Sequence, residues 1–268
     1  HESDAWAFWN NSKFEVGWYT LHVEGREGAD SKNMLRCAGF LEGYLSQKQI
    51  HSHYLLMKDI HNFKRHEPYS PEWTYFMEKN MNYTFESVES YVDSPYWQEI
   101  NYTLTQFSGF VEGYNYRVSK DGSPKDAMTY LDFWFLEAEC ELYDVESAID
   151  RKPKKVSGPT NGEDCTGLIR LLPGFSDIYF AQDTWSDFRD LHGELKEYHF
   201  PIPEIKAKHV LFSQNVGKLF SYDDFYIDDN KLLVLEITMC IFKMSLYDLV
   251  VPENLLTWLR AVRSMWLT

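Results

Sequence analysis

The sequence predicts an α+β fold on three observations. In the first half, apolar residues recur at helical spacing, most clearly at Ile100, Leu104, Phe107 and Val111. After residue 164 the pattern changes to short apolar runs divided by turn residues, which is typical of strands. A last helical pattern follows Pro252, so helices, then strands, then a helix indicate layers of both kinds in one core.

Helix starts can be read in the first half. Ser31 is expected to cap a helix in which Gly39 and Gly43 allow close approach of a neighbour. Ser70-Pro71 and Ser94-Pro95 each place a capping residue before a proline, which is typical of a helix N-terminus. A fourth helix is expected from Lys125 to Ser147.

The second half predicts a hairpin followed by further strands. Residues 165–172 and 178–184 are expected to pair across the Pro173-Gly174 turn. A helix containing Phe188, Leu191 and Leu195 should follow. The remaining expected elements are strands at 209–213, 225–227 and 231–238, and a helix from Pro252 that turns Leu255, Leu256, Leu259 and Val262 inward.

The chain therefore divides into three expected parts. Residues 1–149 form a mainly helical part, and residues 165–268 form a strand-rich core with a closing helix. Residues 150–164 lack an apolar period and are rich in Pro, Gly and Lys, so we expect a linker or an excisable loop.

Charge and composition exclude some classes of protein. The net charge of −15 disfavours nucleic acid as a partner, because its phosphates would be repelled. No apolar run approaches the roughly 20 residues that span a bilayer. His1 stands where a starter Met would, so removal of a leader is expected.

Three sequons support a secretory route, with a lysosomal or extracellular destination. They begin at Asn10, Asn82 and Asn101, and we expect N-linked sugar at each.

The position of Cys165 is typical of a self-processing nucleophile. It follows the breaker-rich segment and opens an apolar strand, so cleavage before it would leave an α-amine beside the thiol, able to act as its base. An inert buried Cys is the common alternative at such a place. Of the other cysteines, Cys37, Cys140 and Cys240, at most one pair can be bridged, and the sequence does not decide the pairing.

Short sequence motifs over nearly the whole chain resemble those of the phospholipase B-like (lamina-ancestor) family of N-terminal-nucleophile hydrolases. Besides the strand that begins at Cys165, the motifs are Phe8-Trp-Asn-Asn-Ser12, Ala38-Gly-Phe-Leu-Glu-Gly-Tyr-Leu45, Asp93-Ser-Pro-Tyr-Trp97, Leu171-Leu-Pro-Gly-Phe175, Thr184-Trp185, Asp223-Asp-Phe-Tyr226 and Val251-Pro-Glu-Asn-Leu-Leu-Thr-Trp258.

The resemblance implies an αββα sandwich, passage to lysosomes or related compartments, and maturation by cleavage before Cys165. It implies that Cys165 is the nucleophile, that Trp185 is an active-site residue, that the substrate is an amide or an acyl ester, as in a phospholipid, and that neither metal nor cofactor is needed.

The sequence departs from the family at three places. Gln182 stands where the family has a His, and an amide cannot take up a proton near neutral pH. The segment 212–217 differs from the family's Phe-Ser-Ser-Tyr-Pro-Gly loop, and Met265 replaces an Asn. Family members also continue for about as much again beyond Thr268.

Further polar residues are candidates for a pocket. Glu236 and Thr238 share one face of an expected strand, with buried hydrogen bonding as the alternative. Asp223 and Asp224 resemble a catalytic carboxylate pair, but adjacent strand positions face opposite ways, so a turn or capping role is favoured. The four histidines between 51 and 66 lack metal-ligand spacing, which favours a solvated helix face.

Two functions remain open at this level. The departures favour a family member with weak or lost hydrolase activity, a pseudoenzyme that serves in scaffolding, binding or assembly. The alternative is an active amidase or acyl-ester hydrolase that uses autocleaved Cys165. In either case a second chain or an oligomer is expected to cover the open sheet.

Overall fold

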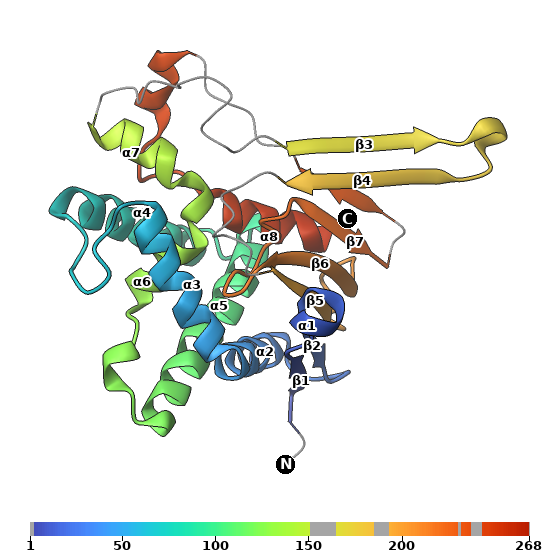
Figure 1. Cartoon of the computed structure of the whole chain (residues 1–268), viewed down its shortest axis with the longest axis horizontal. Helices are drawn as coiled ribbons and strands as arrows, with labels where there is room; N and C mark the ends of the chain where they lie inside the picture. The colour runs from blue at the N-terminus through green and yellow to red at the C-terminus, as the bar shows by residue number, and fades with distance from the viewer. Residues whose placement is uncertain (1–2, 151–164, 185–192, 230–231, 237–242, 268) are drawn as a thin grey trace.

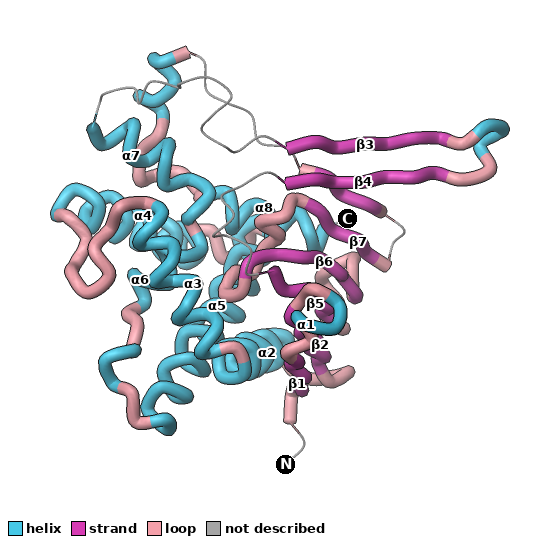
Figure 2. Tube along the Cα trace, in the orientation of Figure 1, coloured by secondary structure: helices cyan, strands magenta, loops and turns pink. Residues whose placement is uncertain are grey.

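The predicted α+β class is confirmed. The structure, a computed structural model, describes residues 3–150, 165–184, 193–229, 232–236 and 243–267. Helices gather on one side of the molecule and strands on the other (Figure 1 and Figure 2).

One sheet of six strands organises the fold. Its order is β1(Ala5–Asn10), β2(Tyr19–Gly25), β5(Gly193–His199), β6(His209–Asn215), β7(Phe225–Asp228) and β8(Leu233–Leu235). β2 and β5 pair in parallel, and all other neighbours are antiparallel. Side chains alternate along β5, so Glu194, Lys196 and Tyr198 are buried. The sheet thus joins strands from both ends of the chain.

Helices cover one face of this sheet. α2(Ser31–Leu45) lies against β1 and β2, and α5(Pro95–Asp121) packs on α2. Their backbones approach closely at glycines, as predicted for Gly39 and Gly43. A methyl group on Gly113 would lie 1.9 Å from the carbonyl oxygen of Phe40. Three more helices precede α5 in the chain: α1(Lys13–Val16), α3(Gln47–Ile60) and α4(Pro71–Ser90).

Helix starts follow the predicted capping residues with one correction. α4 begins at Pro71 with Ser70 as its cap, and α5 begins at Pro95 after Ser94. For α2 the cap is Asp30, not Ser31, because the extended Asp30 places its carboxylate 2.9 Å from the amide of Asn33.

The predicted helix from 125 to 147 is several short ones. These are η1(Pro124–Asp126), α6(Tyr130–Glu137), η2(Glu139–Glu141) and α7(Leu142–Asp150). Thr129 and Asp132 form a reciprocal capping box that begins α6, and this interrupts the expected run.

In the second half one predicted helix was wrong, and the closing helix is present with Leu256, Leu259 and Val262 buried but starts later than predicted. Leu195 lies in strand β5, although a helix was expected; Phe188 and Leu191 lie outside the described residues. The last helix, α8(Thr257–Leu267), begins after Pro252 by more than a turn, following η6(Met244–Leu249). The amide and hydroxyl of Thr257 both donate to Glu141 Oε1, which defines this later start.

The predicted hairpin is present and projects from the body. β3(Cys165–Leu171) and β4(Ile178–Thr184) pair antiparallel across η4(Pro173–Phe175), and Cys165 lies opposite Thr184. Figure 1 shows the hairpin extending beyond the sheet. Exposed apolar residues cover much of it: Leu168, Ile169, Leu171, Phe175, Ile178 and Tyr179.

Buried charges tie the sheet to the helices. Lys196 donates to the carboxylate of Glu42, which also accepts from the hydroxyl of Tyr198 at 2.6 Å. Lys218, after β6, lies 2.7 Å from Glu139. All five side chains are buried. Buried charges require such partners, because removal from water is costly.

None of the described helices is both long enough and apolar enough to cross a membrane.

Candidate functional site

Cys165 contacts a carboxylate from another part of the sheet. It is the first residue of β3, and its Sγ donates to Asp224 Oδ2 at 3.5 Å. Opposite Cys165, the hydroxyl of Thr184 donates to the carbonyl oxygen of Asp223 at 2.9 Å. The start of the hairpin is therefore held against the segment that precedes β7.

The turn before β7 directs Asp224 toward the thiol. Asp224 has a φ of +63°, a left-handed conformation that is uncommon outside glycine. Its neighbour Asp223 turns elsewhere and accepts from the hydroxyl of Ser213 at 2.6 Å. The two carboxylates thus have different partners, and both residues lie in the turn before β7, not in a strand. Strained backbone of this kind is concentrated at functional sites.

Burial changes the proton affinity of these carboxyl groups. It raises the pKa of Asp224 to about 7, against a smaller lowering by the hydrogen bond from Cys165; Glu236 and Asp223 raise it further. Burial also raises the pKa values of Glu236 and Asp223. A carboxyl with a pKa near 7 can exchange a proton with a neighbouring thiol at physiological pH.

Gln182 is engaged with the backbone. Its Nε2 donates to the carbonyl oxygen of Glu236 at 3.2 Å, which links β4 to the end of β8. Its Oε1 is buried and accepts no hydrogen bond from the described residues. Of the other predicted site residues, Trp185 and Thr238 lie outside the described residues.

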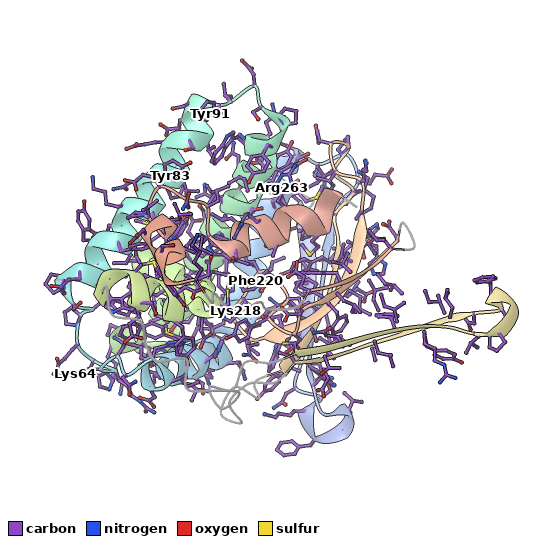
Figure 3. All side chains as sticks on the ribbon, turned by 90° about the horizontal axis from the view of Figure 1, so that it is seen from above. Lys64, Tyr83, Tyr91, Lys218, Phe220 and Arg263 are labelled. Atoms are coloured by element: carbon purple, nitrogen blue, oxygen red, sulfur yellow. The ribbon has the colours of Figure 1, made fainter. Side chains whose placement is uncertain are left out.

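A cavity of about 820 Å³ lies beside the thiol. Cys165, Thr184, Asp224 and Glu236 line it together with residues of α4, α5, α7, η6 and α8. Figure 3 labels two aromatic residues of its wall, Tyr83 on α4 and Phe220 before β7. The structure thus brings Cys165, Asp224 and Glu236 to one cavity.

Glu141 and Arg260 also line this cavity, although no sequence pattern indicated them. Glu141 lies in a stretch that resembled a continuous helix, and Arg260 follows the first turn of α8. Neither residue belongs to a motif, and each meets the cavity only through long-range packing. No local signal could have identified them.

The prediction of a solvated histidine face was wrong for His53 and His61, whereas His66 is exposed. His53 is fully buried, with Nδ1 2.7 Å from the carbonyl oxygen of Val216 and Nε2 3.3 Å from Glu139. His61 also approaches Glu139, at 3.9 Å. These rings stabilise the core. Among the described residues, no group of three or more His, Cys, Asp or Glu side chains is arranged to hold a metal ion.

Comparison with known sequences decides the family. The family model described as "Phospholipase B" matches residues 5–268. The chain belongs to this family. It is similar to phospholipase B-like 1 of Rattus norvegicus, with 30% identity over 274 residues, covering 97% of this chain and 48% of the relative.

Two other members of the phospholipase B family match this chain with similar identity and coverage. Phospholipase B-like protein B of Dictyostelium discoideum is 29% identical over 267 residues, covering 94% of this chain and 46% of the relative. Phospholipase B-like 1 of Homo sapiens is 29% identical over 271 residues, covering 96% of this chain and 47% of the relative. The chain spans about half the length of the curated relatives it matches.

Proposed function

We propose that this chain is the nucleophile-bearing part of an amide or acyl-ester hydrolase, with Cys165 as the nucleophile and low activity in the chain as it stands. The observation that carries the proposal is the 3.5 Å contact between the Cys165 thiol and the Asp224 carboxylate at the edge of the cavity. Membership of the phospholipase B family supports a lipid or fatty amide as substrate.

The chemistry would proceed through a thioester. Asp224, or the amine freed by cleavage before Cys165, takes the thiol proton, and the thiolate attacks the carbonyl carbon of the substrate. The bond to the leaving amine or alcohol breaks, and the leaving group receives that proton. Water then hydrolyses the thioester, which releases the acid and restores the thiol.

Low activity is expected because Gln182 replaces the family's His, and its amide cannot accept a proton.

A scaffold without catalysis is the second candidate, and the hairpin favours it. Its exposed apolar residues, including Ile169 and Phe175, form a surface that a second chain or another copy would cover. The sequons support a secretory glycoprotein, lysosomal or extracellular, for either candidate.

Thiol labelling tests the catalytic proposal. The intact mass first establishes whether the bond between Asp164 and Cys165 is cut. A thiol-reactive acyl probe is then applied to the chain, to Asp224→Asn, and to Cys165→Ala as the blank. We expect slow labelling of Cys165 that Asp224→Asn lowers at least about tenfold and moves away from a pH midpoint near 7.

The matched control is Cys37→Ser, since Cys37 lies in β1–α2 packing away from the cavity. It should leave labelling of Cys165 unchanged. Equal labelling of wild type and Asp224→Asn contradicts the role of Asp224 as proton acceptor. Absence of labelling in a chain cut before Cys165 rejects catalysis and leaves the scaffold.

A further inference from the structure

The cavity contains a second polar group besides the Cys165 site. Glu141 and Asp144 enter it from η2 and α7, and Thr257 and Arg260 enter it from α8. The reaction proposed at Cys165 uses none of these residues. Their arrangement therefore bears on what the cavity binds.

The cavity wall is strongly acidic. Glu141, Asp144, Asp224 and Glu236 face one basic residue among the described residues of the wall, Arg260. Burial raises the pKa of Glu141 to about 7, and Asp144 raises it further, while hydrogen bonds from Thr257 and the charge of Arg260 lower it. A bound cation would stabilise these carboxylates, and a bound anion would be repelled.

One carboxylate oxygen of Glu141 receives no hydrogen bond from the described residues. Its Oε1 accepts from the amide and hydroxyl of Thr257, at 2.8 and 2.7 Å. Its Oε2 is buried and accepts no hydrogen bond from the described residues. A buried acceptor without a donor is costly, so a donor brought by a ligand would be bound favourably.

Aromatic and aliphatic residues complete the wall. Phe76, Tyr83 and Trp97 offer ring faces, and Leu249, Val250 and Val251 offer an aliphatic strip. One ring of the wall already receives a cation, because the guanidinium of Arg263 lies 4.3 Å from the centre of Tyr96. Rings and carboxylates together favour an organic cation, and the strip suits a hydrocarbon chain.

We propose that the cavity binds a cationic amphiphile, with a primary ammonium group at Glu141 Oε2 and an aliphatic chain along residues 249–251. The proposal rests on the function proposed above for the reaction at Cys165, and it names the substrate class of that site. Ligands with a phosphate head are disfavoured by the same carboxylates.

Binding should depend on pH. Glu141 is ionised above about pH 7 and neutral at pH 5, and Asp144, Asp224 and Glu236 follow in the same direction because their pKa values are also raised. An alkylammonium stays charged throughout this range. Affinity for the cation should therefore rise between pH 5 and pH 8.

Calorimetric titration of octylamine into residues 1–268 with Cys165→Ala tests this, with octyl phosphate as the anionic probe. We expect octylamine to bind at least about tenfold more tightly than octyl phosphate at pH 8, and to weaken about tenfold at pH 5. Glu141→Gln should weaken octylamine about tenfold, and Arg260→Gln should strengthen it about threefold. Glu78→Gln, on the exposed face of α4, is the matched control and should have no effect.

Two results overturn the proposal: tighter binding of octyl phosphate, or an octylamine affinity that neither Glu141→Gln nor Arg260→Gln changes. If Glu141→Gln does not fold, Arg260→Gln alone decides, because the two act in opposite directions. The thiol is absent from this experiment. Octylamine binding with no labelling of Cys165 in the wild-type chain would thus reject the hydrolase and keep the ligand class. Labelling of Cys165 without octylamine binding would keep the hydrolase and reject the ligand class.

Discussion

Lys218 Nζ lies 2.7 Å from Glu139 Oε2, and neither side chain exposes more than 1% of its surface. Lys218 also donates to the carbonyl oxygen of Leu136 at 2.6 Å, so it links the segment after β6 to α6 and η2. Burial alone would raise the pKa of Glu139, but Lys218 and His53 together hold it below its ordinary value. Glu139 is therefore ionised, and Lys218 is the basic side chain nearest to its carboxylate.

The first prediction concerns this pair. Lys218→Met should lower the free energy of unfolding by about 3–5 kcal/mol, because Glu139 would remain buried without its main cation. Denaturant titration measures the loss. Lys64→Met is the control, since Lys64 is 73% exposed beside Glu67 and should cost less than about 1 kcal/mol. Figure 3 labels both lysines, Lys218 inside and Lys64 at the periphery. Equal losses would show that Lys218 does not carry a buried pair.

The second prediction concerns pH. Burial raises the pKa values of Glu137 to about 8 and of Glu141, Glu194 and Asp224 to about 7. The folded chain thus binds more protons than the unfolded chain between pH 4.5 and 8. Stability from these groups is full below their unfolded pKa and is lost as pH rises through the folded values. We expect Tm to be at least about 4 °C lower at pH 8 than at pH 5.5.

Thermal unfolding across this range at constant ionic strength checks the second prediction. His51 acts in the opposite direction, because burial lowers its pKa, so its contribution is lost as pH falls. Glu194→Gln removes one raised carboxyl group, and it should flatten the profile. A Tm that increases steadily from pH 5.5 to 8 would contradict the prediction.

The third prediction concerns the crossing of α2 and α5. Gly113→Ala places a methyl group 1.9 Å from the Phe40 carbonyl oxygen, so the helices must separate. We expect a loss of about 1–3 kcal/mol in the free energy of unfolding, by denaturant titration. Ser119→Ala, on the exposed side of α5, is the control and should stay within about 0.5 kcal/mol. A neutral Gly113→Ala would mean that the crossing tolerates a wider separation.

The fourth prediction concerns the hairpin. Ile169 and Phe175 are 68% and 83% exposed, so the isolated chain should associate through β3–β4. Sedimentation velocity is expected to show species larger than the monomer, and Ile169→Lys with Phe175→Lys should shift them to monomer. Tyr75→Lys, at an exposed position on α4, controls for added charge. A wild-type chain that sediments only as monomer would refute this association.

The fifth prediction concerns the sequons. Asn10 and Asn82 are exposed, and Asn101 is half-buried on α5. Sugar is expected at all three, since it is added to the chain before folding completes. Peptide mapping of native material, with and without removal of N-linked sugars, checks each site. Unmodified Asn at every site would remove the support for a secretory route.

Local patterns made the hairpin and the helix starts predictable. Pro173-Gly174 between two apolar runs fixes β3 and β4, and Ser70-Pro71 fixes the start of α4. The sequence also placed Cys165 at the head of its strand. Each of these signals lies within a few residues, so the chain need not fold for them to be read.

The parts of the fold and the site that were not predictable depend on contacts between residues that are distant in sequence. β1 and β2 lie in the part that was expected to be mainly helical, because their place in the sheet depends on the pairing of β2 with the distant β5. Lys196 and Glu194 resemble solvated charges in sequence, yet Glu42 and Gln214 allow their burial. The contact between Cys165 and Asp224 arises in the same way, because the two residues are 59 positions apart in the sequence and meet only in the fold.

The parallel pairing of β2 with β5 has a consequence for any cut before Cys165. Tyr19 to Glu24 lie beside Glu194 to His199, so one sheet contains strands from both sides of that bond. The buried pairs of Lys196 with Glu42 and of Lys218 with Glu139 also cross it. The two pieces of a nicked chain would therefore elute as one particle from a gel-filtration column and separate only on a denaturing gel.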